Sequence, residues 1–512
     1  MHLIDGETGS GKTEVYLKLA SYLIEQGHQV LILLPEIVLT NQLLQRFTER
    51  LGVKPTEWHS RLGAKARREN FQQIMTGKTQ FIIGARSALF LPYHNLKMIV
   101  VDEEHDRSYK QEEGAIYHAR DMAIIRAKSI DAKVLLVSAT PSLESYHNAK
   151  IGKYQYYTLP NRFGAATLPR VELLDLNLHK LAKNSLLSAP LVERIRSVLK
   201  QERQALLFLN KRGFAPIIHC NECAHKESCK NCNSLLVYHQ RRNSLMCHHC
   251  GYKRKYNNKC SECESDDINM FGLGIEKLEE EAKRLFPTAR IAVLTADVMQ
   301  NPKKIQSVLD DIVEGNVDLI LGTQIIAKGL NFPKLKLVAV IDAESNIMGY
   351  DPRAFEQTYQ LLHQVAGRAG RIDDQGIVSI QTYEPQHPLF QCIQTFDKKA
   401  FYEYEYNARK LSNTPPFSRM ITITAIDRSE LRCVETLEGF KSFLPDNDEL
   451  EVMGPAPTPM YYLKGSYRYR LILKVGKTLN IQKNLSTIVS TIQNSDYKNA
   501  RLVVDVDSYL FR

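Results

Sequence analysis

A glycine-rich segment near the start of the chain has the spacing of a phosphate-binding loop. Residues 6–13 read Gly-Glu-Thr-Gly-Ser-Gly-Lys-Thr, which fits G-x-x-x-x-G-K-[ST]. In such a loop the backbone N–H groups turn towards phosphates, the lysine reaches the β- and γ-phosphates, and the threonine hydroxyl binds Mg²⁺. The predicted phosphate-binding residues are Gly6, Glu7, Thr8, Gly9, Ser10, Gly11, Lys12 and Thr13. Lys12 would be catalytic, and Thr13 would also hold Mg²⁺.

An acidic strand end could supply a second metal ligand and a base. Residues 98–101 are predicted to form an apolar strand, and Asp102, Glu103, Glu104 and His105 follow it directly. Asp102 would hold Mg²⁺, and Glu103 would orient an attacking water as general base. Taken alone, such a strand end could equally be a solvated turn.

Two further motifs could complete the same chemistry. Gln364 opens the segment Gln-Val-Ala-Gly-Arg-Ala-Gly-Arg, in which Arg368 and Arg371 could reach across a cleft to a γ-phosphate. By itself this segment would more simply be a solvated basic helix end. Residues 138–141, Ser-Ala-Thr-Pro, carry hydroxyls that could couple neighbouring loops, although a simple turn is the more ordinary interpretation.

Eight of the ten cysteines form four C-x-x-C doublets, which predicts metal ligation rather than disulfides. Five residues separate the first two doublets, and fourteen separate the second from the third, near the spacing of a zinc ribbon. We therefore predict two nested Cys₄ zinc sites. The outer doublets, Cys220, Cys223, Cys260 and Cys263, would share one zinc ion. The inner doublets, Cys229, Cys232, Cys247 and Cys250, would share the other. Basic residues outnumber acidic ones in this segment. The zinc sites could therefore contact a nucleic acid, or they could be purely structural.

Alternating strands and helices must position these motifs. The expected strands of the first half are 30–34, 80–83, 98–101 and 133–137, with residues 3–4 as the stub of an earlier strand. Those of the second half are 205–209, 270–272, 290–294, 319–321, 337–341 and 378–382. This alternation is typical of parallel α/β sheets, which bind ligands at the carboxyl ends of their strands.

The last part of the chain follows a different order. After residue 396 the expected order is β-α-β-β-α-β, a ferredoxin-like possibility. Residues 454–459 are expected to form a Pro-rich loop, and residues 461–470 interleave tyrosines with basic residues. That composition suits stacking on bases with phosphate contacts, or equally a strand with one face in a core.

The segment after the acidic motif is aromatic and basic. In residues 106–120 we predict that Tyr109 or Tyr117 stacks on a base while Arg107 or Lys110 meets a phosphate. Nucleic-acid binding would then act directly on the neighbouring carboxylates. The alternative is a solvated loop with one tyrosine tucked into the domain.

Bulk composition narrows the class of protein. A chain of 512 residues with 44% hydrophobic and 24% charged residues is expected to fold into two to four globular domains. No apolar run approaches the roughly 18 residues that cross a bilayer, and no secretory leader is visible, so we expect a cytoplasmic protein without membrane partners. The net charge of +10 mildly favours a polyanionic partner.

In this order, the motifs resemble the superfamily 2 helicases of the DExH type, and among them the primosomal replication-restart helicases. The segments that carry the resemblance are 6–16, 34–37, 102–106, 138–142, 322–329, 364–371, the eight paired cysteines and 454–457. The resemblance implies an α/β fold with two RecA-like parallel-sheet helicase lobes, 1–165 and 166–395. It also implies a two-zinc insert at 217–266 and a small α+β DNA-binding-type domain at 396–512.

The resemblance also implies a function. ATP and Mg²⁺ would bind between the lobes, with Gln364, Arg368 and Arg371 completing the γ-phosphate site. The protein would be an ATP-hydrolysing DNA helicase that moves 3′ to 5′ on single-stranded and forked DNA during replication restart and primosome assembly. Its partners would be primosome proteins, single-stranded-DNA-binding protein and the machinery that loads the replicative helicase.

The sequence departs from that family in two places. The family's domains ahead of the phosphate-binding loop have no counterpart here, nor does the segment that recognises adenine, and Arg61 stands where the family has a glycine. The alternative expectation is therefore a zinc-stabilised, DNA-binding primosome assembly factor whose motor is inactive because of truncation.

Overall fold

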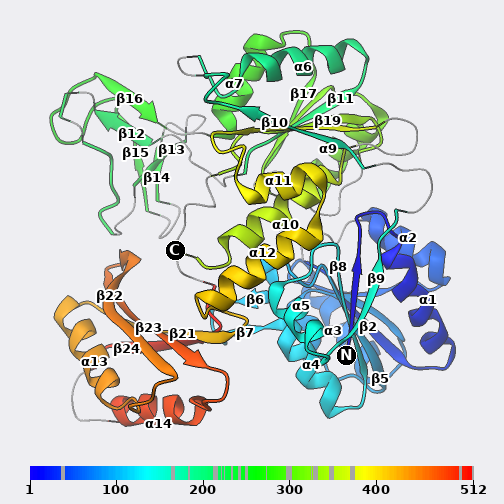
Figure 1. Cartoon of the computed structure of the whole chain (residues 1–512), viewed down its shortest axis with the longest axis vertical. Helices are drawn as coiled ribbons and strands as arrows, with labels where there is room; N and C mark the ends of the chain where they lie inside the picture. The colour runs from blue at the N-terminus through cyan, green and yellow to red at the C-terminus, as the bar shows by residue number, and fades with distance from the viewer. Residues whose placement is uncertain are drawn as a thin grey trace.

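The computed structural model describes residues 1–35, 41–162, 168–182, 185–210, 217–220, 222–223, 225–231, 235–239, 244–247, 252–271, 274–295, 302–324, 326, 332–344, 351–369, 375–494 and 499–509. Two parallel-sheet lobes, a Cys-rich insert and a small C-terminal domain are arranged around a central group of helices (Figure 1). The predicted fold class, two RecA-like lobes with a Cys-rich insert and a small α+β domain, is confirmed. No helix among these residues is long and apolar enough to cross a membrane.

The first lobe is built on a seven-stranded parallel sheet with the order β3-β4-β2-β5-β8-β1-β9. Its strands are β1 (His2–Gly6), β2 (Gln29–Leu33), β3 (Thr56–Trp58), β4 (Phe81–Gly84), β5 (Leu96–Asp102), β8 (Lys133–Ser138) and β9 (Gln155–Leu159). Its helices are α1 (Lys12–Glu25), α2 (Asn41–Leu51), α3 (Ala64–Met75), α4 (Ala119–Ser129) and α5 (Leu143–Lys150). The expected stub at residues 3–4 is a five-residue strand, paired along its length with β8 and β9.

The second lobe is a six-stranded parallel sheet with the order β10-β20-β19-β11-β18-β17. The strands are β10 (Arg170–Asp175), β11 (Gln204–Phe208), β17 (Ile291–Leu294), β18 (Leu319–Gly322), β19 (Leu335–Val340) and β20 (Ile377–Thr382). The helices are α6 (Ala189–Lys200), α7 (Ile275–Leu285), α9 (Pro302–Glu314) and α10 (Ala354–Ala366). Sequence analysis missed β10, because its residues are mostly half-buried and show no regular alternation of apolar and polar side chains.

The insert has its own antiparallel sheet, with the order β15-β14-β13-β12-β16. Its strands are β12 (Ile217–Cys220), β13 (Val237–His239), β14 (Ser244–Met246), β15 (Lys253–Lys255) and β16 (Ile268–Phe271). The strand expected at 270–272 in the second lobe is therefore wrong in its placement, because β16 pairs with β12. A short apolar run predicts a strand but does not indicate which sheet the strand joins.

The C-terminal domain confirms the predicted β-α-β-β-α-β order. Its elements are β21 (Ser418–Asp427), α13 (Glu430–Ser442), β22 (Leu450–Leu463), β23 (Ser466–Gly476), α14 (Gln482–Gln493) and β24 (Arg501–Val506). The antiparallel sheet order β22-β23-β21-β24 is that of a ferredoxin-like fold. The loop expected at 454–459 lies instead within β22, where the register with β23 shifts once between Met453 and Ala456 and again between Pro457 and Tyr462.

A group of helices joins the lobes and leads to the C-terminal domain. After β20, α11 (Pro388–Thr395) and α12 (Lys398–Leu411) pack with α10 in the centre of the molecule (Figure 1). Glu356 of α10 accepts a hydrogen bond from the Leu143 N–H of the first lobe at 2.8 Å and forms an ion pair with Arg409 of α12. Arg353 pairs with Glu144 of α5 at 2.9 Å. These buried contacts fix α10 against the carboxyl edge of the first sheet.

Candidate nucleotide site and Cys-rich metal centre

The phosphate-binding loop follows β1 and opens α1. Gly9 and Gly11 have φ values of 84° and 85°, which residues with a Cβ rarely adopt, and a Cβ on Gly6 would lie 2.5 Å from Ser10 Oγ. The loop therefore needs its glycines to keep this cradle open. Lys12, the first helical residue, donates hydrogen bonds from Nζ to the Gly6 and Glu7 carbonyls at 2.7 and 3.0 Å. This loop at a helix N-terminus fits the phosphates of a nucleotide.

The acidic motif lies at the carboxyl end of β5, two strands from β1. Asp102 Oδ2 accepts a hydrogen bond from Tyr16 at 3.0 Å, and its Oδ1 accepts one from the Glu103 N–H at 3.0 Å. Burial, with the charge of Glu103, raises the pKa of Asp102 to about 7, against the opposing charge of Lys12. A desolvated carboxylate beside the loop is suited to Mg²⁺, whose charge would replace the lost solvation.

The second lobe reaches the acidic motif through Gln364, which lies in the last turn of α10. Gln364 Nε2 lies 3.3 Å from Glu103 Oε2 and 2.9 Å from His105 Nε2. His105 Nδ1 in turn lies 2.7 Å from Ser138 Oγ, at the end of β8. Residues 138–141, which we call the hydroxyl motif, are therefore linked through Ser138 to the loop after β5 and are more than a simple turn.

The structure brings together most of the predicted site residues. Lys12, Asp102, Glu103 and Gln364 meet at one edge of the first sheet. Gly367 follows α10, and a Cβ there would lie 3.0 Å from Thr8 Oγ1, so the loop that carries Arg368 touches the phosphate-binding loop. Arg371, and the part of 322–329 at 325 and 327–329, lie outside the described residues.

Sequence analysis assigned no role to two residues of this site, Tyr16 and Glu104. Tyr16 lies one helical turn after Lys12, and that spacing on an amphipathic helix was an available signal. Glu104 is fully buried and accepts hydrogen bonds from the Ser142 N–H, the Ser142 and Ser145 hydroxyls, and Arg120. It ties the acidic motif to the start of α5, and no local signal in the sequence marks this role.

The predicted base-stacking role of Tyr109 is wrong. Tyr109 is buried in the core of the first lobe, and its hydroxyl donates to the Leu33 and Asp102 carbonyls at 2.9 and 2.6 Å. Lys110 is also buried, in a 2.7 Å ion pair with Asp505 of the C-terminal domain.

The other two residues of that prediction have different outcomes. Arg107 donates to Gln357 and to the Tyr509 carbonyl, so its observed contacts are within the protein. Tyr117, in β7 (Tyr117–His118), is half-buried against Phe90, and its base-stacking role stays a prediction.

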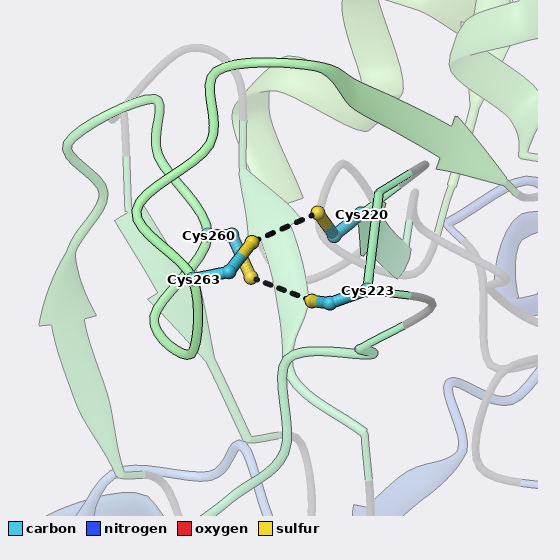
Figure 2. Close-up of side chains that lie close together, drawn as sticks. All are labelled: Cys220, Cys223, Cys260 and Cys263. Carbon is cyan, nitrogen blue, oxygen red and sulfur yellow. Dashed lines mark hydrogen bonds between the residues drawn. The ribbon is translucent and has the colours of Figure 1, made fainter.

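Four cysteines of the insert converge on one point (Figure 2). Cys220 Sγ lies 3.5 Å from Cys263 Sγ, and Cys223 Sγ lies 3.6 Å from Cys260 Sγ. Zinc–sulfur bonds of about 2.3 Å in a tetrahedron place sulfurs about 3.8 Å apart, so the spacing fits zinc. The Cys223 backbone N–H stabilises the Cys220 thiolate and lowers its pKa to about 7. The outer doublets are thus grouped as the nested arrangement predicts.

The inner doublets are described only in part, because Cys232 and Cys250 lie outside the described residues. Cys229 and Cys247 are both buried in the small core of the insert. The Asn231 N–H points to Cys229 Sγ at 3.4 Å, as the Glu262 N–H points to Cys260 Sγ. Cys229 therefore has the same local geometry as a member of the first cluster.

Four known families match separate stretches of the chain. A family described as DEAD/DEAH box helicase matches residues 1–149, and the helicase conserved C-terminal domain matches 254–373. The Cys-rich region of the PriA DNA helicase matches 229–255, and the primosomal protein N C-terminal domain matches 410–509.

Several relatives are similar over nearly the whole chain. The replication restart protein PriA of Rickettsia conorii is 43% identical over 99% of this chain and 78% of its own length. The PriA proteins of Haemophilus influenzae and Bacillus subtilis are 40% and 36% identical, over 69% and 64% of their lengths. Among solved structures, the DUF1998 helicase MrfA bound to DNA has a TM-score of 0.47 at 17% identity, over 79% of this chain and 49% of that chain.

Proposed function

The chain belongs to the PriA family of replication restart helicases, and from this premise we propose that it is an ATP-driven DNA motor that moves 3′ to 5′ and acts at stalled forks. The observation that best supports a motor is the contact of Gln364 with Glu103 and His105. It joins the second lobe to the acidic motif beside the phosphate-binding loop. A movement of the second lobe would therefore shift Glu103 and His105, and a change at the nucleotide would shift Gln364.

We assign the hydrolytic roles as follows. Lys12 would contact the β- and γ-phosphates, while Thr13 and Asp102 would hold Mg²⁺, which neutralises charge on those phosphates. Glu103 would take the proton of the attacking water, and the hydrogen bond from Gln364 would hold the Glu103 carboxylate in place. Arg368 and Arg371 would stabilise the charge that develops on the γ-phosphate.

The remaining assignments rest on the family. They are two zinc ions, single-stranded and forked DNA as substrates, and primosome proteins, single-stranded-DNA-binding protein and the replicative helicase loading machinery as partners. The domain boundaries at 165 and 395, a zinc-binding insert at 217–266 whose sheet continues to Phe271, and a cytoplasmic location belong to the same proposal.

The test is ATP hydrolysis measured with and without single-stranded DNA, together with unwinding of duplexes that carry a 3′ or a 5′ tail. We expect hydrolysis that rises when single-stranded DNA is added, and unwinding of the duplex that carries the 3′ tail. DNA binding with no ATP hydrolysis would instead support the assembly factor with an inactive motor. Unwinding that needs the 5′ tail would contradict the assigned direction.

A further inference from the structure

An acidic side chain lies inside the phosphate-binding loop. Glu7 is the second residue of the loop, and its side chain is only 16% exposed. Backbone N–H groups in such a loop bind phosphates because they present partial positive charge. A carboxylate at this place would repel the same phosphates unless a cation compensates it.

Two side chains from outside the first lobe lie against Glu7, and one of them, Lys398, is a cation. Lys398 Nζ lies 3.1 Å from Glu7 Oε1, and His363 Nε2 lies 3.3 Å from Glu7 Oε2. Burial alone would raise the pKa of Glu7, but His363 and Lys398 together lower it to about 2. Glu7 is therefore ionised at neutral pH, and the cation that balances its charge is Lys398, the first residue of α12.

Lys398 is also bound to the first sheet beside the loop. Its Nζ pairs with Asp5 Oδ1 at 2.7 Å and donates to the Ala139 carbonyl at 3.3 Å. Asp5 is the last residue but one of β1, next to the loop, and accepts a second hydrogen bond from Tyr156 at 2.6 Å. One ammonium group thus touches the end of β1, the phosphate-binding loop and the hydroxyl motif after β8.

We propose that Lys398 is a positioning residue for nucleotide binding, because it cancels the charge of Glu7 when α12 is docked against the first lobe. The inference rests on the proposed ATP site. Moving α12 away would leave Glu7 uncompensated beside the phosphates. Nucleotide affinity then depends on docking of α12, and by linkage a bound nucleotide favours the docked state to the same extent.

The test is the equilibrium dissociation constant of a fluorescent ADP, measured on the full chain with variants at both positions. Lys398→Met is expected to weaken binding about tenfold, within the usual range of coupling between sites. Lys398→Arg should retain most of the affinity. Glu7→Gln alone should tighten binding a few-fold, since it removes the repelling charge and leaves the cation. In the Glu7→Gln background, Lys398→Met should weaken binding by a clearly smaller factor than in the wild-type background, because only Asp5 is then left without its cation.

The matched control is Lys399→Met, since Lys399 is the next residue and is exposed. This variant should bind like the wild type. An equal loss on Lys398→Met in both backgrounds would show that Lys398 only clamps the helix, and would overturn the proposal. So would an unchanged constant in Lys398→Met, or weaker binding in Glu7→Gln, a variant that keeps the shape of the side chain. A wild-type protein that binds no nucleotide would refute the proposed function itself.

Discussion

Replacing Glu103 by glutamine is expected to abolish ATP turnover and to preserve ATP binding. Glutamine keeps the shape of the side chain and can still accept the hydrogen bond from Gln364 Nε2, which now spans 3.3 Å. It cannot accept a proton from water, and loss of a general base costs about 10²–10⁴-fold in rate. Single-turnover hydrolysis and nucleotide affinity, measured on the same preparation, separate the two effects.

Lys12→Ala is the matching variant for binding. It removes the cation expected at the β- and γ-phosphates, so both nucleotide affinity and turnover should be lost. The pair of variants therefore distinguishes a base from a phosphate ligand. Normal hydrolysis in Glu103→Gln would rule out Glu103 as the base, and unchanged affinity in Lys12→Ala would place the phosphates elsewhere.

The first lobe could be predicted well because its signals are local. The phosphate-binding loop needs a strand before it and a helix after it, and β1 and α1 are found in those places. Apolar runs such as β2 are fully buried, as strands of a parallel sheet covered on both faces must be. The acidic strand end and the loop then meet because carboxyl ends of parallel strands share one edge.

The failures came from contacts between parts of the chain that are distant in sequence. Tyr109 and Lys110 are residue types that often contact nucleic acids. Here Tyr109 is buried in the core of the first lobe, and Lys110 forms an ion pair with Asp505 of the C-terminal domain. The partnership of Glu7 with Lys398 joins residues at opposite ends of the helicase lobes, and neither position has a local pattern that predicts it. Spacing likewise could not assign Met270 and Phe271 to the sheet of the insert.

Removing zinc is expected to unfold the insert and leave both lobes folded. The described core of the insert contains few residues, including Ile218, Leu236, Leu245 and Tyr256, together with cysteines. A core of this size rarely supports a fold without metal or disulfides. Structural zinc contributes about 10–16 kcal/mol of apparent binding energy in small modules. Hydrogen exchange after chelation should therefore show loss of protection in β12–β16, while β1 and β11 stay protected.

Metal content decides whether there are two sites. Mass spectrometry of the intact protein should find two zinc ions per chain. Cys229→Ser should lose one ion and keep the cluster of Cys220, whose four sulfurs are already grouped without it. Cys392→Ser is the control, since Cys392 lies on α11 outside the insert, and it should retain both ions. A single zinc in the wild type, or two in Cys229→Ser, would refute the nested pairing, because the inner thiolates would then hold no ion of their own.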